Sequence, residues 1–177
     1  MAPDRQPLLE GELVRLRPMT ENDREALFAV ASDPLIWEVH PAHDRWKRDV
    51  FDAFFDAGLA SGGALVIEDK ASGAVIGSSR YDGHDPQADE IEIGWTYIAR
   101  AYWGGTYNRE IKRLMLDHIH RFVGTALFQV GEDNIRSRKA MLKIGGVLRP
   151  GTAERIMAGE VRRHVTYEIR RQGNLEA

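Results

Sequence analysis

The chain contains no cysteine among its 177 residues, and this absence removes several kinds of chemistry. Without a thiol there are no disulfide bonds, no thiolate metal ligands and no cysteine nucleophile to carry a covalent intermediate. No apolar run approaches the roughly 20 residues that span a bilayer. The first twelve residues, MAPDRQPLLEGE, carry charges where a signal peptide has its apolar core. We therefore expect a cytoplasmic protein with no membrane partner.

The composition is otherwise that of a soluble globular domain. Hydrophobic residues make up 43% of the chain and charged residues 29%, both ordinary values. The sequence has no internal repeat, low-complexity tract or long linker. This length supports one substantial hydrophobic core. We predict a single domain over residues 1–177, with its core at about 9–170 and short termini.

Charge is distributed unevenly along the chain. The net charge of −3 gives no reason to expect a nucleic-acid partner. Between Arg109 and Arg149, however, nine Lys and Arg residues face four Asp and Glu residues, which leaves the rest of the chain with an excess of eight negative charges. The basic segment is typical either of a solvated helix face or of a site for an anionic ligand, and both interpretations remain open.

Hydrophobic periodicity predicts both strands and helices. Alternation predicts strands at 12–18, 64–69, 74–83, 90–98, 126–130, 153–158 and 161–169, and a polar loop at 82–89. Helical spacing predicts helices after Thr20, at 46–59, at 108–123 and at 134–144. Three consecutive strands without a helix exclude a simple doubly wound fold. The predicted fold class is therefore α/β in the broad sense, with a mixed sheet of the α+β type. Helices cover both faces of this sheet, and neighbouring strands in its later part are parallel.

Residues 101–115, AYWGGTYNREIKRLM, place Gly104 and Gly105 between a predicted strand and a predicted helix. A helix N-terminus has four backbone N–H groups without intrahelical partners, and it binds phosphates where the preceding loop lets the backbone approach them. Glycines give that access. The stretch matches neither the P-loop nor G-x-G-x-x-G. A plain turn and an anion cradle are both consistent with it.

The same stretch resembles the pyrophosphate-binding motif of the GNAT superfamily, N-acetyltransferases that use acetyl-CoA. In the RimJ/RimL-like branch this motif often has the form Tyr-Trp-Gly-x-Gly-Tyr-Ala-x-Glu-Ala. The matching residues are Tyr102, Trp103, Gly104, Tyr107 and Glu110. Thr106 stands where the central glycine is usual, and Asn108 where a small residue is usual.

A second segment supports the resemblance. Asn134-Ile-Arg-Ser137, continuing to Lys143-Ile-Gly145, resembles the family's Asn-x-x-Ser…Lys-x-Gly-Phe segment, with Gly146 in place of Phe. Residues 9–18 and 92–94 resemble the first and fourth strands of the branch. The likeness covers roughly residues 9–169.

The resemblance implies a GNAT fold with a central, mostly antiparallel sheet, and acetyl-CoA as co-substrate. It also implies a splayed gap between the fourth and fifth predicted strands, where the pantetheine arm pairs with backbone. The implied cofactor-binding residues are Tyr97, Ile98, Gly104, Gly105, Thr106, Tyr107, Asn108, Asn134, Ser137 and Arg138. Arg109 and Lys139 are alternatives to Arg138 for a further phosphate, and each of the three is also consistent with a solvated surface charge.

Direct transfer of an acetyl group to an amine needs a base for the amine and a proton for the leaving thiolate. Glu92 and Glu90 are the candidate bases, because residues two apart on a strand point to the same face. Burial among aromatic residues would raise the pKa of either carboxyl group toward neutrality. Ser137 is the candidate proton donor. The structural alternatives are carboxylates paired with arginine, a surface serine, and Asn134 as a helix N-cap.

The acceptor amine is the least constrained part of the prediction. Trp37, His40 and Tyr81 are candidate substrate contacts, and His40-x-x-His43 matches no known metal arrangement, so we predict no metal. A protein N-terminus and a small-molecule amine are both consistent with the sequence, and the acidic remainder of the chain suits a cationic acceptor. Homodimers are common in the RimJ/RimL-like branch, which makes a homodimer a further expectation.

Two alternative functions remain. One is a GNAT-like domain that binds acyl-CoA without turnover, and the other is a domain that binds another phosphorylated ligand.

Overall fold

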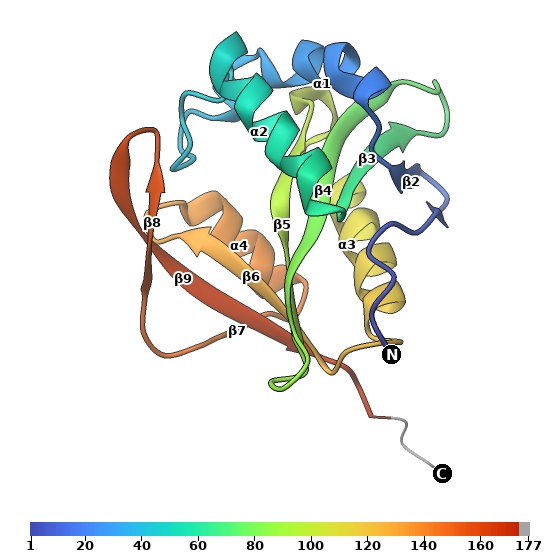
Figure 1. Ribbon diagram of the computed structural model, residues 1–177, viewed down its shortest axis with the longest axis vertical. Helices are drawn as coiled ribbons and strands as arrows, with labels where there is room; N and C mark the ends of the chain where they lie inside the picture. Colours follow the sequence, from blue (N-terminus) through green and yellow to red (C-terminus); the bar gives the residue numbers. More distant parts are fainter. Residues whose placement is uncertain (174–177) are drawn as a thin grey trace.

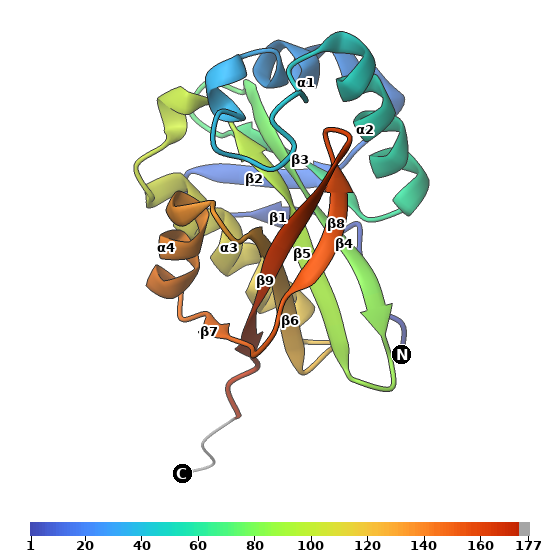
Figure 2. The same cartoon turned by 90° about the vertical axis from the view of Figure 1, so that its left-hand side faces the viewer.

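A computed structural model describes residues 1–173 as a twisted sheet with helices packed on it (Figures 1 and 2). The strands are β1 (Leu9–Glu10), β2 (Val14–Pro18), β3 (Ala64–Asp69), β4 (Val75–Asp85), β5 (Glu90–Ile98), β6 (Thr125–Gly131), β7 (Val147–Leu148), β8 (Ala153–Met157) and β9 (Glu160–Arg170). The helices are α1 (Arg24–Ala31), α2 (Arg48–Ser61), α3 (Thr106–Ile119) and α4 (Ile135–Lys143), with short 3₁₀ turns at Glu21–Asp23, Pro34–Ile36 and Arg100–Tyr102. No helix in this part of the chain is long and apolar enough to cross a membrane.

The sheet has the order β1-β2-β3-β4-β5-β6-β9-β7, and β8 pairs with the free part of β9. Among the described strands only β5 and β6 are parallel neighbours, and every other pairing is antiparallel. The predicted mixed, mostly antiparallel sheet is confirmed. The parallel neighbours predicted for the later part of the sheet are limited to β5 and β6, because β9 returns antiparallel to β6 and does not extend a parallel series.

Helices cover both faces of the sheet, as predicted. One core cluster joins the strands to α3 through Ile111, Met115 and Ile119. The other joins α1 and α2 to Trp37 and to Tyr97. These apolar residues recur at helical spacing on one side of each helix, so burying them against the sheet fixes which face each helix covers. The two layers leave the carboxyl end of β5 between them.

Some predicted boundaries differ from those observed. Strand β4 continues to Asp85, where a polar loop had been predicted from residue 82, because it keeps pairing with β5 as far as Asp85 and Glu90. The first helix begins with a 3₁₀ turn in which the Asp23 carboxylate accepts a hydrogen bond from the Thr20 backbone N–H at 2.8 Å. The two-residue strand β7 was not predicted, because so short a segment carries no periodicity.

Strands β5 and β6 separate after three residue pairs, which run from Glu90 with Thr125 to Glu92 with Leu127. Beyond that point β5 bulges, because Ser78 pairs with Tyr97 while Arg80 pairs with Gly94. Trp95, in the bulge, has a φ of 53°, a left-handed conformation that is strained for a non-glycine residue. A bulge bends its strand and redirects its side chains. The predicted splay between these strands is therefore present, and it opens toward the start of α3.

Candidate functional site

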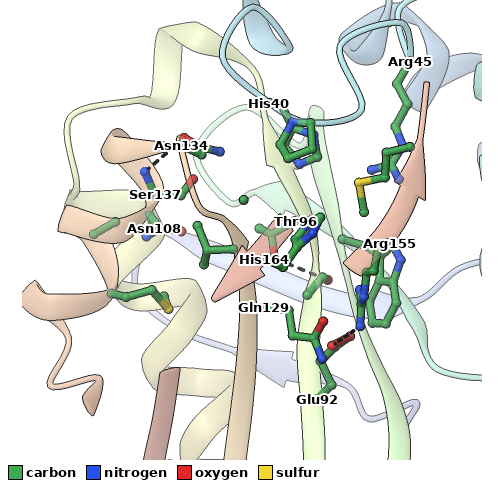
Figure 3. A pocket seen from close by; sticks show the side chains of 18 of the residues that line it. His40, Arg45, Glu92, Thr96, Asn108, Gln129, Asn134, Ser137, Arg155 and His164 are labelled. Atoms are coloured by element: carbon green, nitrogen blue, oxygen red, sulfur yellow. Dashed lines mark hydrogen bonds and ion pairs between the residues drawn. The ribbon is translucent and has the colours of Figure 1, made fainter. Parts of the chain in front are cut away.

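The splay between β5 and β6 holds a cleft with two connected chambers. The outer chamber, about 480 Å³, lies against the glycine loop before α3 and against α4. The inner chamber, about 170 Å³, lies on the other side of the shared residues, between β5, β6 and the β8–β9 hairpin (Figure 3). The two linings share His40, Thr96, Asn108, Ser137 and Ala140. A molecule that passes from one chamber into the other must therefore pass these residues.

The glycine loop forms the mouth of the outer chamber. Gly104 has a φ of 119° and Gly105 a φ of 101°, conformations that side-chain-bearing residues rarely adopt. Gly105 is the N-cap of α3, so no side chain caps the helix. A Cβ atom built on either glycine meets no atom within 4 Å. The loop thus leaves the N–H groups and positive end of α3 open to the chamber, which suits an anion.

Positive side chains dominate the charge of the outer chamber. Its charged lining residues are Arg109, Arg136, Lys139 and Lys143, and no carboxylate lines it within residues 1–173. Arg136 stacks over Trp103, with its guanidinium carbon 3.9 Å from the ring centre. Predicted Arg138 lines neither chamber, because its guanidinium donates to the Tyr167 hydroxyl at 3.1 Å and to the Glu132 carbonyl at 3.0 Å. Its neighbour Arg136, which the sequence analysis did not select, lies in the chamber instead.

The carboxyl end of β5 forms one wall of the outer chamber. Tyr97 and Ile98 pair with β4 on one side, and no strand within residues 1–173 pairs with them on the other. The Tyr97 ring packs on Trp37, with ring centres 5.2 Å apart. Trp103 donates its indole N–H to the Ile98 carbonyl at 3.0 Å. This wall combines unpaired strand backbone with apolar side chains, which fits a ligand that is both extended and amide-bearing.

Ser137 stands where the chambers meet, and Asn134 lines the inner chamber beside it. Asn134 is the N-cap of α4, and its side-chain oxygen accepts a hydrogen bond from the Ser137 backbone N–H at 3.3 Å. The structural alternative for Asn134 is therefore confirmed, and the cap directs the first turn of α4 at the cleft. The half-buried Ser137 side chain lines both chambers.

Glu92 is the only carboxylate that lines the inner chamber within the described part of the chain. It is 7% exposed, and it accepts a hydrogen bond from Arg155 at 2.6 Å. Burial raises the pKa of Glu92, and the positive charge of Arg155 opposes that rise. Glu90 lies outside both chambers, where Arg149 donates a short hydrogen bond to it. The structure therefore brings one of the two predicted carboxylates to the cleft.

Of the predicted acceptor contacts, Trp37 lines the outer chamber and His40 lines both. The His40 Nδ1 atom accepts a hydrogen bond from the Ala42 backbone N–H at 2.9 Å. Burial lowers the pKa of His40 to about 3, so its imidazole is neutral and carries its proton on Nε2. Tyr81 lies in the core, where its hydroxyl donates to the Met115 carbonyl at 2.6 Å.

Two further predicted residues lie beside the cleft without lining it. Thr106 begins α3, and the Tyr107 hydroxyl donates to Asp69 at 3.1 Å on the far side of that helix. Within residues 1–173 no three His, Asp or Glu side chains form a cluster that would hold a metal ion.

The inner chamber also contains residues that were not predicted from the sequence, namely Arg45, Lys112, Gln129, Arg155 and His164. Lys112 is buried on α3 and donates from Nζ to the Thr96 hydroxyl at 2.7 Å. Burial lowers its pKa to about 7. The signal that identifies it is its spacing from Met115 and Ile119, which places a lysine on the buried face of the helix. The other four come from loops and strands that meet only in the folded chain.

Comparisons with known proteins agree with this architecture. Residues 14–147 match the family model described as acetyltransferase (GNAT) domain. A GCN5-related N-acetyltransferase from Brucella melitensis superposes with a TM-score of 0.81 at 22% identity, over 93% of this chain and 79% of that one. A probable GNAT-family acetyltransferase from Chromobacterium violaceum has the same score and identity over 96% and 87%. A spermidine N-acetyltransferase from Vibrio cholerae, solved with CoA and spermine, has a TM-score of 0.70 at 14% identity over 90% and 96%.

The family model covers most of the chain, and the splayed strands and the open helix N-terminus lie within the residues it matches. Members of this family transfer acetyl groups from acetyl-CoA. The chain belongs to the GNAT acetyltransferase family.

Proposed function

We propose that the protein transfers the acetyl group of acetyl-CoA to a primary amine by direct attack, and that it belongs to the RimJ/RimL-like branch. The observation that carries the proposal is the separation of β5 from β6 after three residue pairs, directly above the open N-terminus of α3. This arrangement supplies, in one cleft, unpaired strand backbone for an amide-bearing arm and N–H groups for a diphosphate. The solved Vibrio cholerae relative, which contains CoA, supports this use of the fold.

The residues present fit the parts of acetyl-CoA. Gly104, Gly105 and the start of α3 would hold the diphosphate, with Arg109, Arg136, Lys139 and Lys143 as counter-charges. The backbone of Tyr97 and Ile98 would hold the pantetheine arm. When bound, acetyl-CoA supplies an activated thioester. The amine nitrogen attacks its carbonyl carbon, the carbon–sulfur bond breaks, and the amine gives up one proton while the thiolate gains one.

Two residues of this chain are placed to handle those protons. Glu92 lies in the inner chamber, where burial raises its pKa, and this suits it to accept the amine proton either directly or through a water molecule. Ser137 lies where the chambers meet and would donate a proton to the thiolate. His40 offers an N–H group at the same constriction, where a carbonyl oxygen acquires negative charge. A cytoplasmic location, expected from the sequence of the N-terminus and the lack of a long apolar run, and a homodimer, expected from the resemblance, stay predictions.

The test is amine-dependent release of CoA thiol, with the acetylated product identified by mass spectrometry. We expect product formation by the wild type and a loss of roughly 100-fold or more in kcat for Glu92→Gln. Asp117→Asn changes an exposed carboxylate on α3 and serves as the matched control. If the protein binds acetyl-CoA but acetylates none of a wide set of amines, the alternative of a non-catalytic acyl-CoA-binding domain is favoured instead.

A further inference from the structure

The inner chamber has an excess of positive charge. Its acidic and basic lining residues other than histidine are Arg45, Lys112, Arg155 and Glu92, and Glu92 is already bonded to Arg155. No carboxylate in residues 1–173 forms an ion pair with Arg45 or with Lys112, and the lining histidines His40 and His164 both have lowered pKa values. Buried cations without a partner are costly unless a ligand supplies the opposite charge.

Arg45 is placed to meet that ligand. It lies in the segment before α2, and its guanidinium stacks over the rings of Phe54 at 4.1 Å and Trp37 at 5.7 Å. Burial lowers its pKa to about 10, and the group stays protonated at neutral pH. Aromatic faces hold the guanidinium, while the inner chamber lies open to it (Figure 3). A guanidinium fork held in this way suits a carboxylate, which accepts two parallel N–H bonds.

In its protonated form, Lys112 adds a second positive charge from α3. Its Nζ atom has the Thr96 hydroxyl as its one polar partner among the described residues, at 2.7 Å, and lies 5.5 Å from the centre of the Phe128 ring. An ammonium group has three N–H donors, so a hydroxyl partner leaves donor capacity for an anion in the chamber.

Gln129 offers the complementary feature, an acceptor without a donor. Its side-chain oxygen is buried and has no hydrogen-bond partner in the described part of the chain. Buried acceptors are almost always satisfied in the functional state. Gln129 and Glu92 both line the inner chamber and lie toward one end of it in Figure 3, with Arg45 toward the other. The chamber therefore offers two acceptors for an amine and a cation for an anionic group.

We infer that the acceptor is a small primary amine that also carries a carboxylate, the amino-acid class, with its carboxylate on Arg45 and its amine toward Glu92 and Gln129. This inference rests on the proposed function and narrows it. The chamber volume of about 170 Å³ suits a molecule of that size. A polyamine would place further positive charge beside Arg45 and Lys112, so the cationic acceptor suggested by the overall charge of the chain is disfavoured by the local charge.

The test compares each acid with its own amide. Glycine, L-alanine, L-leucine and L-phenylalanine, their primary amides, and spermidine are offered with saturating acetyl-CoA, and kcat/KM is expressed per concentration of neutral amine. We expect at least one acid to exceed its amide by about tenfold or more, as the loss of a charge-assisted hydrogen bond implies. Arg45→Met keeps apolar contact with Phe54 and should abolish the preference. Arg45→Lys should retain part of it.

The matched control is Arg48→Met, because Arg48 also stacks on a ring, that of Phe28 at 4.6 Å, but lines neither chamber. It should keep the preference of the wild type. Three results would overturn the inference and leave cofactor binding intact. The amides or spermidine could be used as well as the acids, or the preference for the acid could survive Arg45→Met. The third is that a protein that binds acetyl-CoA gives no product from any of these amines. Failure to bind acetyl-CoA would remove the proposed function and this inference with it. Thermal melting confirms that each variant is folded.

Discussion

Lys112 on α3 donates a hydrogen bond to the Thr96 hydroxyl at 2.7 Å, in the part of β5 that has already separated from β6. The lysine is 5% exposed and has no carboxylate partner within residues 1–173. A lysine buried in this way is destabilising when protonated, because its charge has lost its hydration. Its position in the cleft indicates that the protein tolerates this cost for the site.

Lys112→Met should stabilise the protein, and more so at pH 6 than at pH 9. The folded pKa is about 7 against an ordinary 10.5. The unfolded chain therefore binds more protons between these values, and wild-type stability from this group rises with pH. Urea unfolding at both pH values should show the advantage of the variant shrinking by on the order of 2–3 kcal/mol from pH 6 to pH 9. Lys139→Met, at an exposed position on α4, should show no such change. If Lys112→Met stabilised the protein equally at both pH values, burial would not lower the pKa of Lys112.

Arg155→Met should move the acidic limb of the pH–activity profile to higher pH. Glu92 must be ionised to accept a proton, and the positive charge of Arg155 lowers a pKa that burial raises. Removing that charge leaves the effect of burial unopposed, so a higher pH is needed for the active form. The profile of kcat/KM is the measurement. Arg149→Met releases Glu90 instead and should leave the limb in place. A limb that follows Arg149 would make Glu90 the base.

Replacing Asn134 separates its two roles. Asn134→Ala removes the cap of α4 and should cost about 1 kcal/mol in the free energy of unfolding. Asn134→Ser restores a capping oxygen and should recover most of that stability, yet acetyl-CoA affinity should stay reduced if the amide also contacts the cofactor. Urea unfolding and calorimetry measure the two effects. If Asn134→Ser recovered both the stability and the acetyl-CoA affinity, capping of α4 would be the whole role of Asn134.

Glu110→Ala should destabilise the fold by about 2–3 kcal/mol without altering acetyl-CoA affinity in the folded protein. The Glu110 carboxylate accepts hydrogen bonds from the backbone N–H groups of Glu12, Leu13 and Val14, at 2.8–2.9 Å, and so ties the start of the sheet to α3. Asp117→Ala, at an exposed position on the same helix, should change stability by less than about 0.5 kcal/mol. Comparable effects of the two substitutions would refute the structural role of Glu110.

Periodicity predicted the long elements well, because side-chain burial repeats every two residues in strands and every 3.6 residues in helices. The resemblance to the family, and not periodicity, pointed to Gly104 and Ser137, which line the same cleft as Glu92. It chose Arg138 over Arg136 because a charged residue on a short helix gives no sign of which way it points. It placed Tyr81 in the site, although the ring faces the core.

The remaining site residues follow from tertiary structure alone. Arg155 reaches Glu92 from a hairpin 63 positions later in the sequence. Arg45 enters the inner chamber only because Phe54 and Trp37 hold its guanidinium there. No local pattern encodes such contacts, since they depend on how β8, β9 and the segment before α2 pack around the splayed strands.

The most direct test of the central claim is calorimetric titration of acetyl-CoA into the wild type, Gly104→Asp and Gly73→Asp. Both glycines have positive φ and open space around them, but Gly73 lies in the β3–β4 turn away from the cleft. Both substitutions therefore place a side chain at a positive φ, and only Gly104→Asp adds a side chain and a negative charge to the glycine loop. We predict binding by the wild type and Gly73→Asp, and its loss in Gly104→Asp. Equal binding by all three folded proteins, or by none, would contradict a cofactor site at this loop.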